Sequence, residues 1–250
     1  MLQGMGSNPN SVLVSVCLYV PLWKGLVMLR YVCSLVFGLA VLVPAFGQTP
    51  FPARNVLAGQ TVTVTKGEYL LTNQCTIRQG GKLVIEAGTV IKVDGPGIVF
   101  YNQGILEING TEAEPVQVSP LPGKNCGTLF CPWVSGQRPQ ISVSYLDWTS
   151  TVNANCLFLQ ATDFTISNSK ITNRAVTTAA TRVCVSLNTG SVGVISESTL
   201  DGCSPEIAKP SKGLIVNSAD VVDLINTVIN RTTEPVDINK ASTLISGSIE

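Results

Sequence analysis

The sequence predicts an all-β solenoid in which short parallel strands stack into about eight coils. The first observation is a repeat: GQTVTVTKG, GKLVIEAGT and GILEINGT align Val62, Leu83 and Leu106 at steps of 21 and 23 residues. The second is another apolar column with nearly the same period, in Leu71, then IKV and then VQV. Chance alternation would not keep two columns in phase, and no helical periodicity separates them, so we expect one coil per repeat.

An antiparallel sandwich is the alternative to this solenoid. Sandwich strands are usually joined by hairpin turns, and Asn109-Gly110 is the one strong hairpin signal, which itself belongs to the repeat. The solenoid is therefore the better interpretation.

The C-terminal half continues the pattern with a longer period, because Ile166, Ile195 and Leu224 are 29 residues apart. A second apolar segment, such as CLFL or VCVSL, lies between successive members, so each coil holds at least two strands. Inward positions are Ile, Leu and Val, and outward ones are Ser, Thr and Asn. We expect turns with left-handed backbone at four asparagines, Asn168, Asn173, Asn226 and Asn230.

One row of apolar residues is expected to mark the successive coils. A rod with eight such marks, spaced by about 4.8 Å, would be roughly 35 to 40 Å long. The marks are Val62, Leu83, Leu106, Ile141, Ile166, Ile195, Leu224 and Leu244.

Residues 1–47 are predicted to be an N-terminal extension plus a secretory signal peptide. Translation from Met28 would give a short segment with Arg30, an apolar stretch and a helix-breaking proline, with small residues before a cut ahead of Gln48. An uncleaved membrane anchor is the alternative, although Lys24 and Arg30 interrupt the apolar sequence. The sequence thus predicts a secreted or cell-surface protein with one domain over residues 48–250.

The amino-acid composition limits the kinds of partner that the protein is expected to bind. With 45% apolar and 13% charged residues the chain is expected to be ordered. Its net charge is zero, so we expect no basic surface of the kind that nucleic-acid binding needs. Membrane contact is expected only through an uncleaved signal or a further C-terminal domain. The chain ends inside a strand-like motif at Ile249-Glu250, so we expect either a longer protein or a covered end.

Six cysteines follow residue 47, an even number that makes disulfides plausible in an exported chain. Cys126 and Cys131 are predicted to close a loop, and the pairing of the other four stays open. A metal site is disfavoured because the chain has no histidine and lacks paired CxxC motifs.

The run GTVIKVDGPGIVFYNQGILEINGTEAEPVQVSP resembles the secreted right-handed parallel β-helix repeat proteins of the pectin-lyase-like superfamily. In those proteins a GTVIKF-like strand and three further short motifs form consecutive sides, and ISNSKITN is similar to their later coils. The resemblance covers roughly residues 56–250 and implies a right-handed β-helix. It does not specify chemistry, since the superfamily includes lyases, hydrolases, adhesins and proteins without known activity.

Catalysis has few candidate residues. The adjacent aspartates of related polygalacturonases are missing, because no Asp-Asp occurs in the chain, which counts against a hydrolase. A lyase would need a base and a cation, for which Arg174, Arg182, Asp163 and Asp201 are weak candidates; solvated turn charges are the simpler interpretation. No cofactor is expected, except Ca²⁺ if the protein is a lyase.

The clearest interruption of the repeat is SPLPGKNCGTLFCPWVSGQRP, residues 119–139, which we interpret as an insertion that carries recognition. Trp133 with Lys124, Arg138 and Trp148 would offer a stacking face and hydrogen-bond donors to a sugar. The simpler alternative is that Trp133 folds back onto the rod. We therefore predict an exported, non-catalytic module that binds a polysaccharide or surface glycan or is purely structural, with a polysaccharide lyase or glycoside hydrolase as the alternative.

Overall fold

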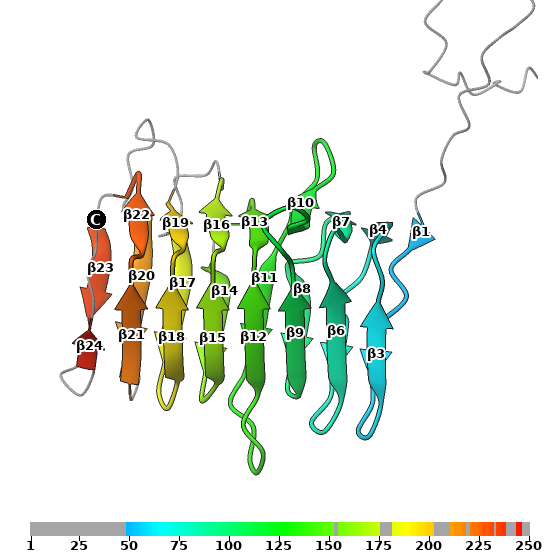
Figure 1. Ribbon diagram of the computed structural model, residues 1–250, viewed down its shortest axis with the longest axis horizontal. Helices are drawn as coiled ribbons and strands as arrows, with labels where there is room; N and C mark the ends of the chain where they lie inside the picture. The colour runs from blue at the N-terminus through cyan, green and yellow to red at the C-terminus, as the bar shows by residue number, and fades with distance from the viewer. Residues whose placement is uncertain are drawn as a thin grey trace, which may run out of the picture. The chain divides into compact units, whose positions relative to one another are not determined.

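The computed structural model describes residues 49–152, 155–175, 182–202, 211–218, 221–232, 234–238 and 244–246. Within these ranges the regular secondary structure consists of β-strands alone. The strands form three parallel eight-stranded sheets, here called A, B and C (Figure 1). The chain visits the sheets in turn, so each coil contributes one strand to each sheet. The protein is thus a right-handed parallel β-helix of eight coils, as predicted, and seven strand spacings of about 4.8 Å give about 34 Å.

Sheet A forms one side of the coil and contains the first strand of each coil. Its inward row runs from Ile91 through Val118, Trp148 and Ile171 to Leu200, all fully buried. The strands are β1 (Thr49–Pro50), β4 (Glu68–Leu71), β7 (Val90–Val93), β10 (Val116–Pro120), β13 (Leu146–Ser150), β16 (Lys170–Asn173), β19 (Thr199–Asp201) and β22 (Val228–Asn230).

Sheet B is the second side. Its inward row pairs Phe100 with Leu129, Leu157, Val185 and Leu214 in successive coils. The strands are β2 (Asn55–Val56), β5 (Cys75–Ile77), β8 (Ile98–Asn102), β11 (Thr128–Cys131), β14 (Asn155–Gln160), β17 (Arg182–Asn188), β20 (Ser211–Asn217) and β23 (Glu234–Ile238).

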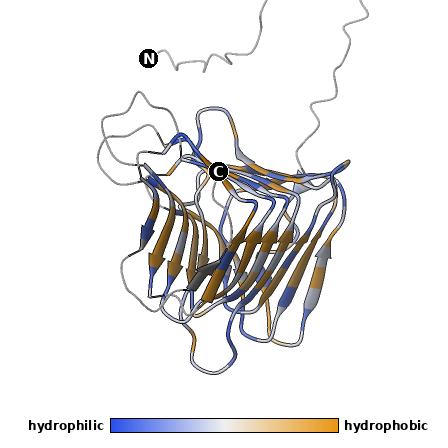
Figure 2. Cartoon of the chain, turned by 60° about the vertical axis from the view of Figure 1, so that its left-hand side comes forward, coloured by the Kyte–Doolittle hydropathy of each residue, from blue (hydrophilic) through white to orange (hydrophobic). Residues whose placement is uncertain are grey.

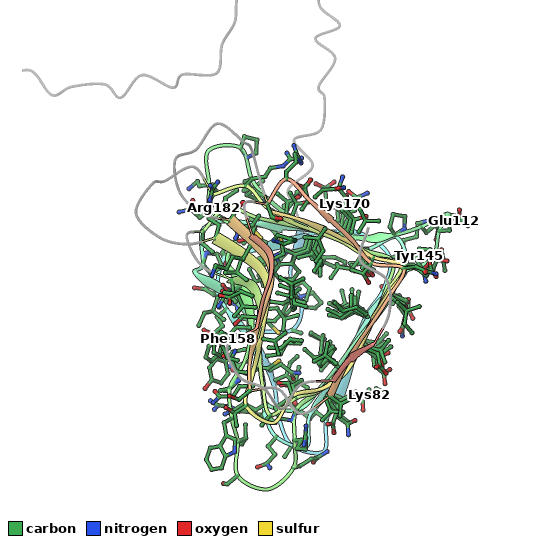
Figure 3. The ribbon with its side chains drawn as sticks, turned by 90° about the vertical axis from the view of Figure 1, so that its left-hand side faces the viewer. Lys82, Glu112, Tyr145, Phe158, Lys170 and Arg182 are labelled. Atoms are coloured by element: carbon green, nitrogen blue, oxygen red, sulfur yellow. The ribbon has the colours of Figure 1, made fainter. Side chains whose placement is uncertain are left out.

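Sheet C closes the third side. Viewed along the axis of the β-helix, the three sheets enclose a column of inward side chains (Figure 3). Phe158 lies on sheet B, and Lys82 and Tyr145 lie near the corners that sheet C forms with sheets B and A. The strands are β3 (Thr61–Val64), β6 (Lys82–Glu86), β9 (Ile105–Asn109), β12 (Gln140–Ser144), β15 (Asp163–Ser167), β18 (Val192–Ser196), β21 (Val221–Ile225) and β24 (Leu244–Ser246).

The register of sheet C confirms most of the expected row and corrects it at two steps in the C-terminal half. The step between the halves is correct, because Leu106 pairs with Ile141. Val62, Leu83 and Leu106 are direct neighbours, as are Ile166, Ile195 and Leu224. The expected row then continued from Ile141 to Ile166 and from Leu224 to Leu244, which is wrong by two or more residues. Ile141 pairs with Phe164, Ile166 pairs with Val143, and Leu244 pairs with Val221.

The error at the step from Ile141 to Ile166 has a packing cause. Phe164 occupies an inward position, and its neighbour in the next coil is Gly193. A Cβ atom at Gly193 would lie 2.0 Å from the Phe164 carbonyl oxygen and 2.7 Å from Cγ of its ring, so the close approach of the Phe164 backbone and ring requires a glycine here. The pair therefore fills an inward row without showing a regular apolar repeat in the sequence.

The corner between sheets C and A has the left-handed backbone that was expected at asparagine. Equivalent residues Tyr145, Asn168, Glu197 and Asn226 have φ between 46° and 49°. The expectation is confirmed for Asn168 and Asn226. Asn173 and Asn230 instead end strands of sheet A, outside the positive-φ residues.

A row of buried hydroxyl groups lies directly after this corner. Oγ of Ser169 donates to the Ser167 carbonyl at 2.7 Å, and Oγ of Ser198 makes the same contact with Ser196 one coil later. The Ser169 amide in turn donates to Oγ of Ser198 at 3.1 Å. These contacts satisfy polar groups that the turn would otherwise bury without partners.

The segment 119–139 is not one continuous loop. Strand β11 crosses sheet B in its middle and divides it into a turn over residues 121–127 and a loop over residues 132–139. The turn and the loop lie on opposite sides of the coil, above and below in Figure 1. Hydrophobic residues are concentrated in the strands around them (Figure 2).

The cysteines of this segment do not form the predicted disulfide. Cys126 and Cys131 are free, fully buried thiols. Cys131 is the last residue of the extended strand β11 and Cys126 precedes that strand; strand residues advance by about 3.3 Å each, whereas a disulfide requires two Cα atoms within about 7 Å. Cys75, Cys156 and Cys184 are also free and buried.

The predicted signal peptide, its Met28 start and its cleavage before Gln48 lie outside the described residues. Among those from residue 49 onward that the structure describes, there is no helix with the length and apolar character needed to cross a bilayer.

Candidate functional site

A groove of about 520 Å³ lies at the corner between sheets B and C, beside the loop of residues 132–139. One wall of the groove is this loop. The other wall consists of the corners of two consecutive coils, which are joined by a hydrogen bond of 3.0 Å from the Ala161 amide to the Thr189 carbonyl. The lining residues are Trp133, Val134, Ser135, Gly136, Arg138, Gln160, Ala161, Thr189 and Gly190.

Contacts with three other coils hold the loop in place. The side-chain amide of Gln79, two coils earlier, donates to the carbonyls of Ser135 at 3.1 Å and Gln137 at 3.4 Å. On the other side Arg138 forms an ion pair of 2.9 Å with Asp163 and donates to the Gly190 carbonyl. The groove wall is thus fixed before any ligand arrives, which lowers the ordering cost of binding.

Trp133 is exposed at the tip of this wall. Its relative exposure of 63% is the highest among the large exposed hydrophobic residues that the structure describes. The simpler alternative, in which the indole folds back onto the rod, is therefore wrong. An exposed indole beside a polar groove is an arrangement that suits stacking against an amphipathic ligand.

Arg138 lines the groove, where its charge has a partner on the next coil. Its guanidinium is shared between the Asp163 carboxylate and the Gly190 carbonyl. The two side chains are 39% and 48% exposed, so water and a ligand can reach the ion pair. This pair supplies both hydrogen-bond donors and acceptors at the groove edge.

The structure does not bring Lys124 and Trp148 to this site. Lys124 lies in the 121–127 turn on the opposite side of sheet B, where its ammonium forms an ion pair of 2.9 Å with Asp94. Trp148 is fully buried in sheet A and contacts the Phe100 ring at a centroid distance of 6.0 Å. Both predictions of ligand contact beside Trp133 are therefore corrected.

The weak catalytic candidates are separated between two corners. Asp163 begins strand β15 in sheet C, beside the groove, whereas the others lie at the corner between sheets A and B. There Arg174 is exposed, and Arg182 is fully buried and donates to the Ala175 carbonyl at 3.1 Å. The four residues do not form one constellation.

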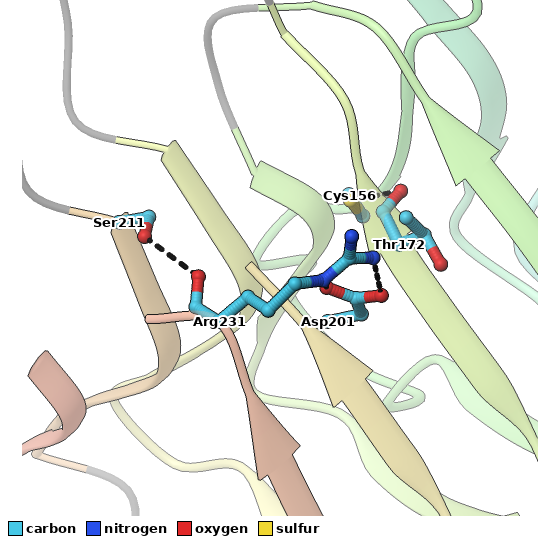
Figure 4. Close-up of polar contacts among 5 residues, drawn as sticks. All are labelled: Cys156, Thr172, Asp201, Ser211 and Arg231. Atoms are coloured by element: carbon cyan, nitrogen blue, oxygen red, sulfur yellow. Dashed lines mark hydrogen bonds and ion pairs between the residues drawn. The ribbon is translucent and has the colours of Figure 1, made fainter. Parts of the chain in front are cut away.

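Asp201 is a structural carboxylate and not the solvated turn charge that the simpler interpretation expected. It ends strand β19 and is buried, and Nε of Arg231 donates to its Oδ1 at 2.8 Å (Figure 4). The Arg231 carbonyl in turn accepts from Oγ of Ser211 at 3.3 Å. These contacts tie coil seven to coil eight.

A row of stacked aromatic rings lies on the outer face of sheet B and was not predicted from the sequence. Tyr101, Phe130 and Phe158 pair across three strands, with ring centroids 5.7 Å and 4.9 Å apart and interplanar angles of 28° and 15°. Because the rings cover one another's faces, the middle ring offers its edge to a ligand. We interpret the row as stabilising the sheet.

Among the described residues, no three or more His, Cys, Asp and Glu side chains are grouped so that they could hold a metal ion. Burial raises the pKa of the thiols of Cys75, Cys126 and Cys131 to about 12, and it raises that of Cys156 well above its ordinary value. These cysteines are protonated at neutral pH and are poor nucleophiles.

Sequence reasoning identified Trp133 and Arg138 but missed the opposite wall of the groove. Gln160 and Thr189 have no distinctive motif. Gln160 pairs with Asn188 in the next coil and Thr189 follows Asn188, so both lie at the same corner of consecutive coils. Any loop inserted at this corner one coil earlier would lie against them. That periodic placement was the signal available.

Comparison of the chain with protein families, with curated proteins and with solved structures gives no match.

Proposed function

We propose that this protein is an exported β-helix protein that binds a polysaccharide or surface glycan, without catalysis, in the groove beside Trp133. The observation that carries the proposal is the exposed indole on a loop fixed to other coils by Gln79, Asp163 and Gly190. A sugar ring offers an apolar face to an aromatic ring and hydroxyl groups to the polar atoms around it.

The polar atoms of the groove support the same ligand class. Gln160 offers an amide, Thr189 a hydroxyl, and the Arg138–Asp163 pair offers donors and acceptors close together. These groups match a ligand that is rich in hydroxyl groups along an extended edge. A net charge of zero gives no support to a nucleic-acid partner.

Location and family form part of the proposal. The Arg30-containing signal-like segment supports secretion or display at the cell surface, and the GTVIKV-type coils support membership of the pectin-lyase-like superfamily. The lyase or hydrolase alternative lacks a constellation of candidate residues in the described structure, and it remains an outcome of the test below.

The test is retention of the secreted chain on a panel of insoluble neutral and acidic polysaccharides, with assays for unsaturated uronate and new reducing ends. We expect retention on at least one polysaccharide without turnover. Trp133→Ala should weaken it at least tenfold, about 1.4 kcal/mol, because the stacking face is lost.

Leu57→Ala is the matched control, because Leu57 is a large exposed apolar residue, 51% exposed, outside the groove. It should retain full binding. Turnover of any polysaccharide would replace the proposal by the enzyme alternative. Retention that is equal in wild type and Trp133→Ala, or absent throughout the panel, would refute the groove as a glycan site.

A further inference from the structure

We infer that the groove selects an uncharged glycan, because Asp163 neutralises Arg138, the charged residue of its lining. This inference rests on the proposed function and specifies the ligand class of the same site. It distinguishes neutral polysaccharides from uronate polymers, the ligands that a basic groove would select.

The first step is the charge of the lining. Of the nine described residues that line the groove, Arg138 is the one that carries a charge. The remaining polar groups, among them the Gln160 amide and the Thr189 hydroxyl, are neutral. Any attraction of the groove for an anion therefore depends on the Arg138 guanidinium.

The second step is the state of that guanidinium. The terminal nitrogen Nη2 of Arg138 lies 2.9 Å from Oδ1 of Asp163, and the same nitrogen donates to the Gly190 carbonyl. A ligand carboxylate that approached Arg138 would have to displace a carboxylate already in place, or lie beside it. The first exchange gains no net attraction, and the second adds like-charge repulsion.

Hydroxyl groups face neither obstacle. A guanidinium has five N–H donors; Nε of Arg138 is buried and Nη2 makes both contacts, which leaves the donors of Nη1 for a sugar oxygen. The Asp163 carboxylate can accept from a neighbouring sugar hydroxyl, since this side chain is 48% exposed and a carboxylate has lone pairs beyond the one used by Arg138. The ion pair can thus bind a neutral ligand at both partners without being broken.

The matched probes are a neutral polysaccharide retained in the panel and its carboxymethylated derivative, which differ in charge on the same backbone. Wild type should bind the neutral form at least tenfold more tightly. Asp163→Asn exposes an uncompensated guanidinium, so it should gain about tenfold for the carboxymethylated form and keep most of its affinity for the neutral form. Arg138→Gln in the Asp163→Asn background should abolish that gain.

Glu107→Gln is the control for net charge. It removes one carboxylate from the outer face of sheet C, where Glu107 pairs with Lys82 at 2.7 Å, and leaves the groove lining unchanged. It should not increase binding of the carboxymethylated form. Circular dichroism of each variant checks that the β-helix is intact.

Two results would overturn the inference and leave glycan binding in place. One is tighter binding of the carboxymethylated form by wild type, lost in Arg138→Gln. The other is an equal gain in Asp163→Asn and Glu107→Gln, which would assign the effect to overall charge. Absence of retention on every neutral and acidic polysaccharide would instead refute the proposed function itself.

Discussion

Raising the pH from 8 to 10 under reducing conditions should destabilise the protein strongly, because its core contains thiols that stay protonated when folded. Burial raises the pKa of Cys75, Cys126 and Cys131 to about 12, and that of Cys156 well above its ordinary value. In the unfolded chain these thiols ionise near pH 9. The unfolded state therefore loses protons first, and stability falls as the pH rises.

The magnitude follows from this difference. Each thiol contributes stability that is fully present below pH 9 and is lost progressively up to about pH 12. Between pH 8 and pH 10 the loss is about 1.4 kcal/mol for one thiol and about 5 kcal/mol for four. That is comparable with the whole stability of an ordinary domain, about 5 to 15 kcal/mol.

The assay is urea unfolding monitored by circular dichroism at half-unit pH steps, with a reductant present throughout. Cys131→Ala, compared with its own value at pH 7, should flatten the pH dependence by about one quarter, whatever its effect on stability at neutral pH. A free energy of unfolding that stays constant between pH 8 and pH 10 would refute the reasoning, since it would mean that these cysteines are not buried free thiols.

Two substitutions test packing in the sheets. Gly193→Ala should cost about 3 kcal/mol or more in the free energy of unfolding, because its Cβ would lie 2.0 Å from a carbonyl oxygen of the preceding coil; an unchanged melting temperature would contradict the register. Phe130→Ala should cost about 1 to 3 kcal/mol and more than Phe158→Ala, because Phe130 stacks on two rings and Phe158 on one. Equal losses would show that stacking contributes little.

The architecture was predictable because the β-helix repeats its packing in the sequence. Inward pairs such as Leu83 with Ile85 and Leu106 with Ile108 stay in one register over several coils. The prediction failed where packing used unlike residues. Phe164 and Gly193 fill one inward row together, and a pattern of matching apolar residues cannot detect a glycine that accommodates the backbone and ring of a neighbouring phenylalanine.

The site was predictable to a smaller extent, for a geometric reason. Trp133 lies in the loop that interrupts the repeat, so its exposure could be anticipated. The prediction that Lys124 and Trp148 lie beside Trp133 assumed that residues close in the sequence are also close in space. The short strand β11 carries the chain across a whole side of the coil and thereby separates Lys124 from Trp133. Trp148 is buried because it lies two residues after Leu146 in β13, and alternate residues of a strand point inward.

The contacts of the 132–139 loop have a mechanical consequence. Coils of a solenoid touch only their nearest neighbours, so unravelling from either end can proceed one coil at a time. This loop, which leaves coil four, is fastened backward to Gln79 in coil two and forward to Gly190 in coil six. Under pulling force we expect the outer coils to peel away individually, while coils two to six resist and then yield together in one step.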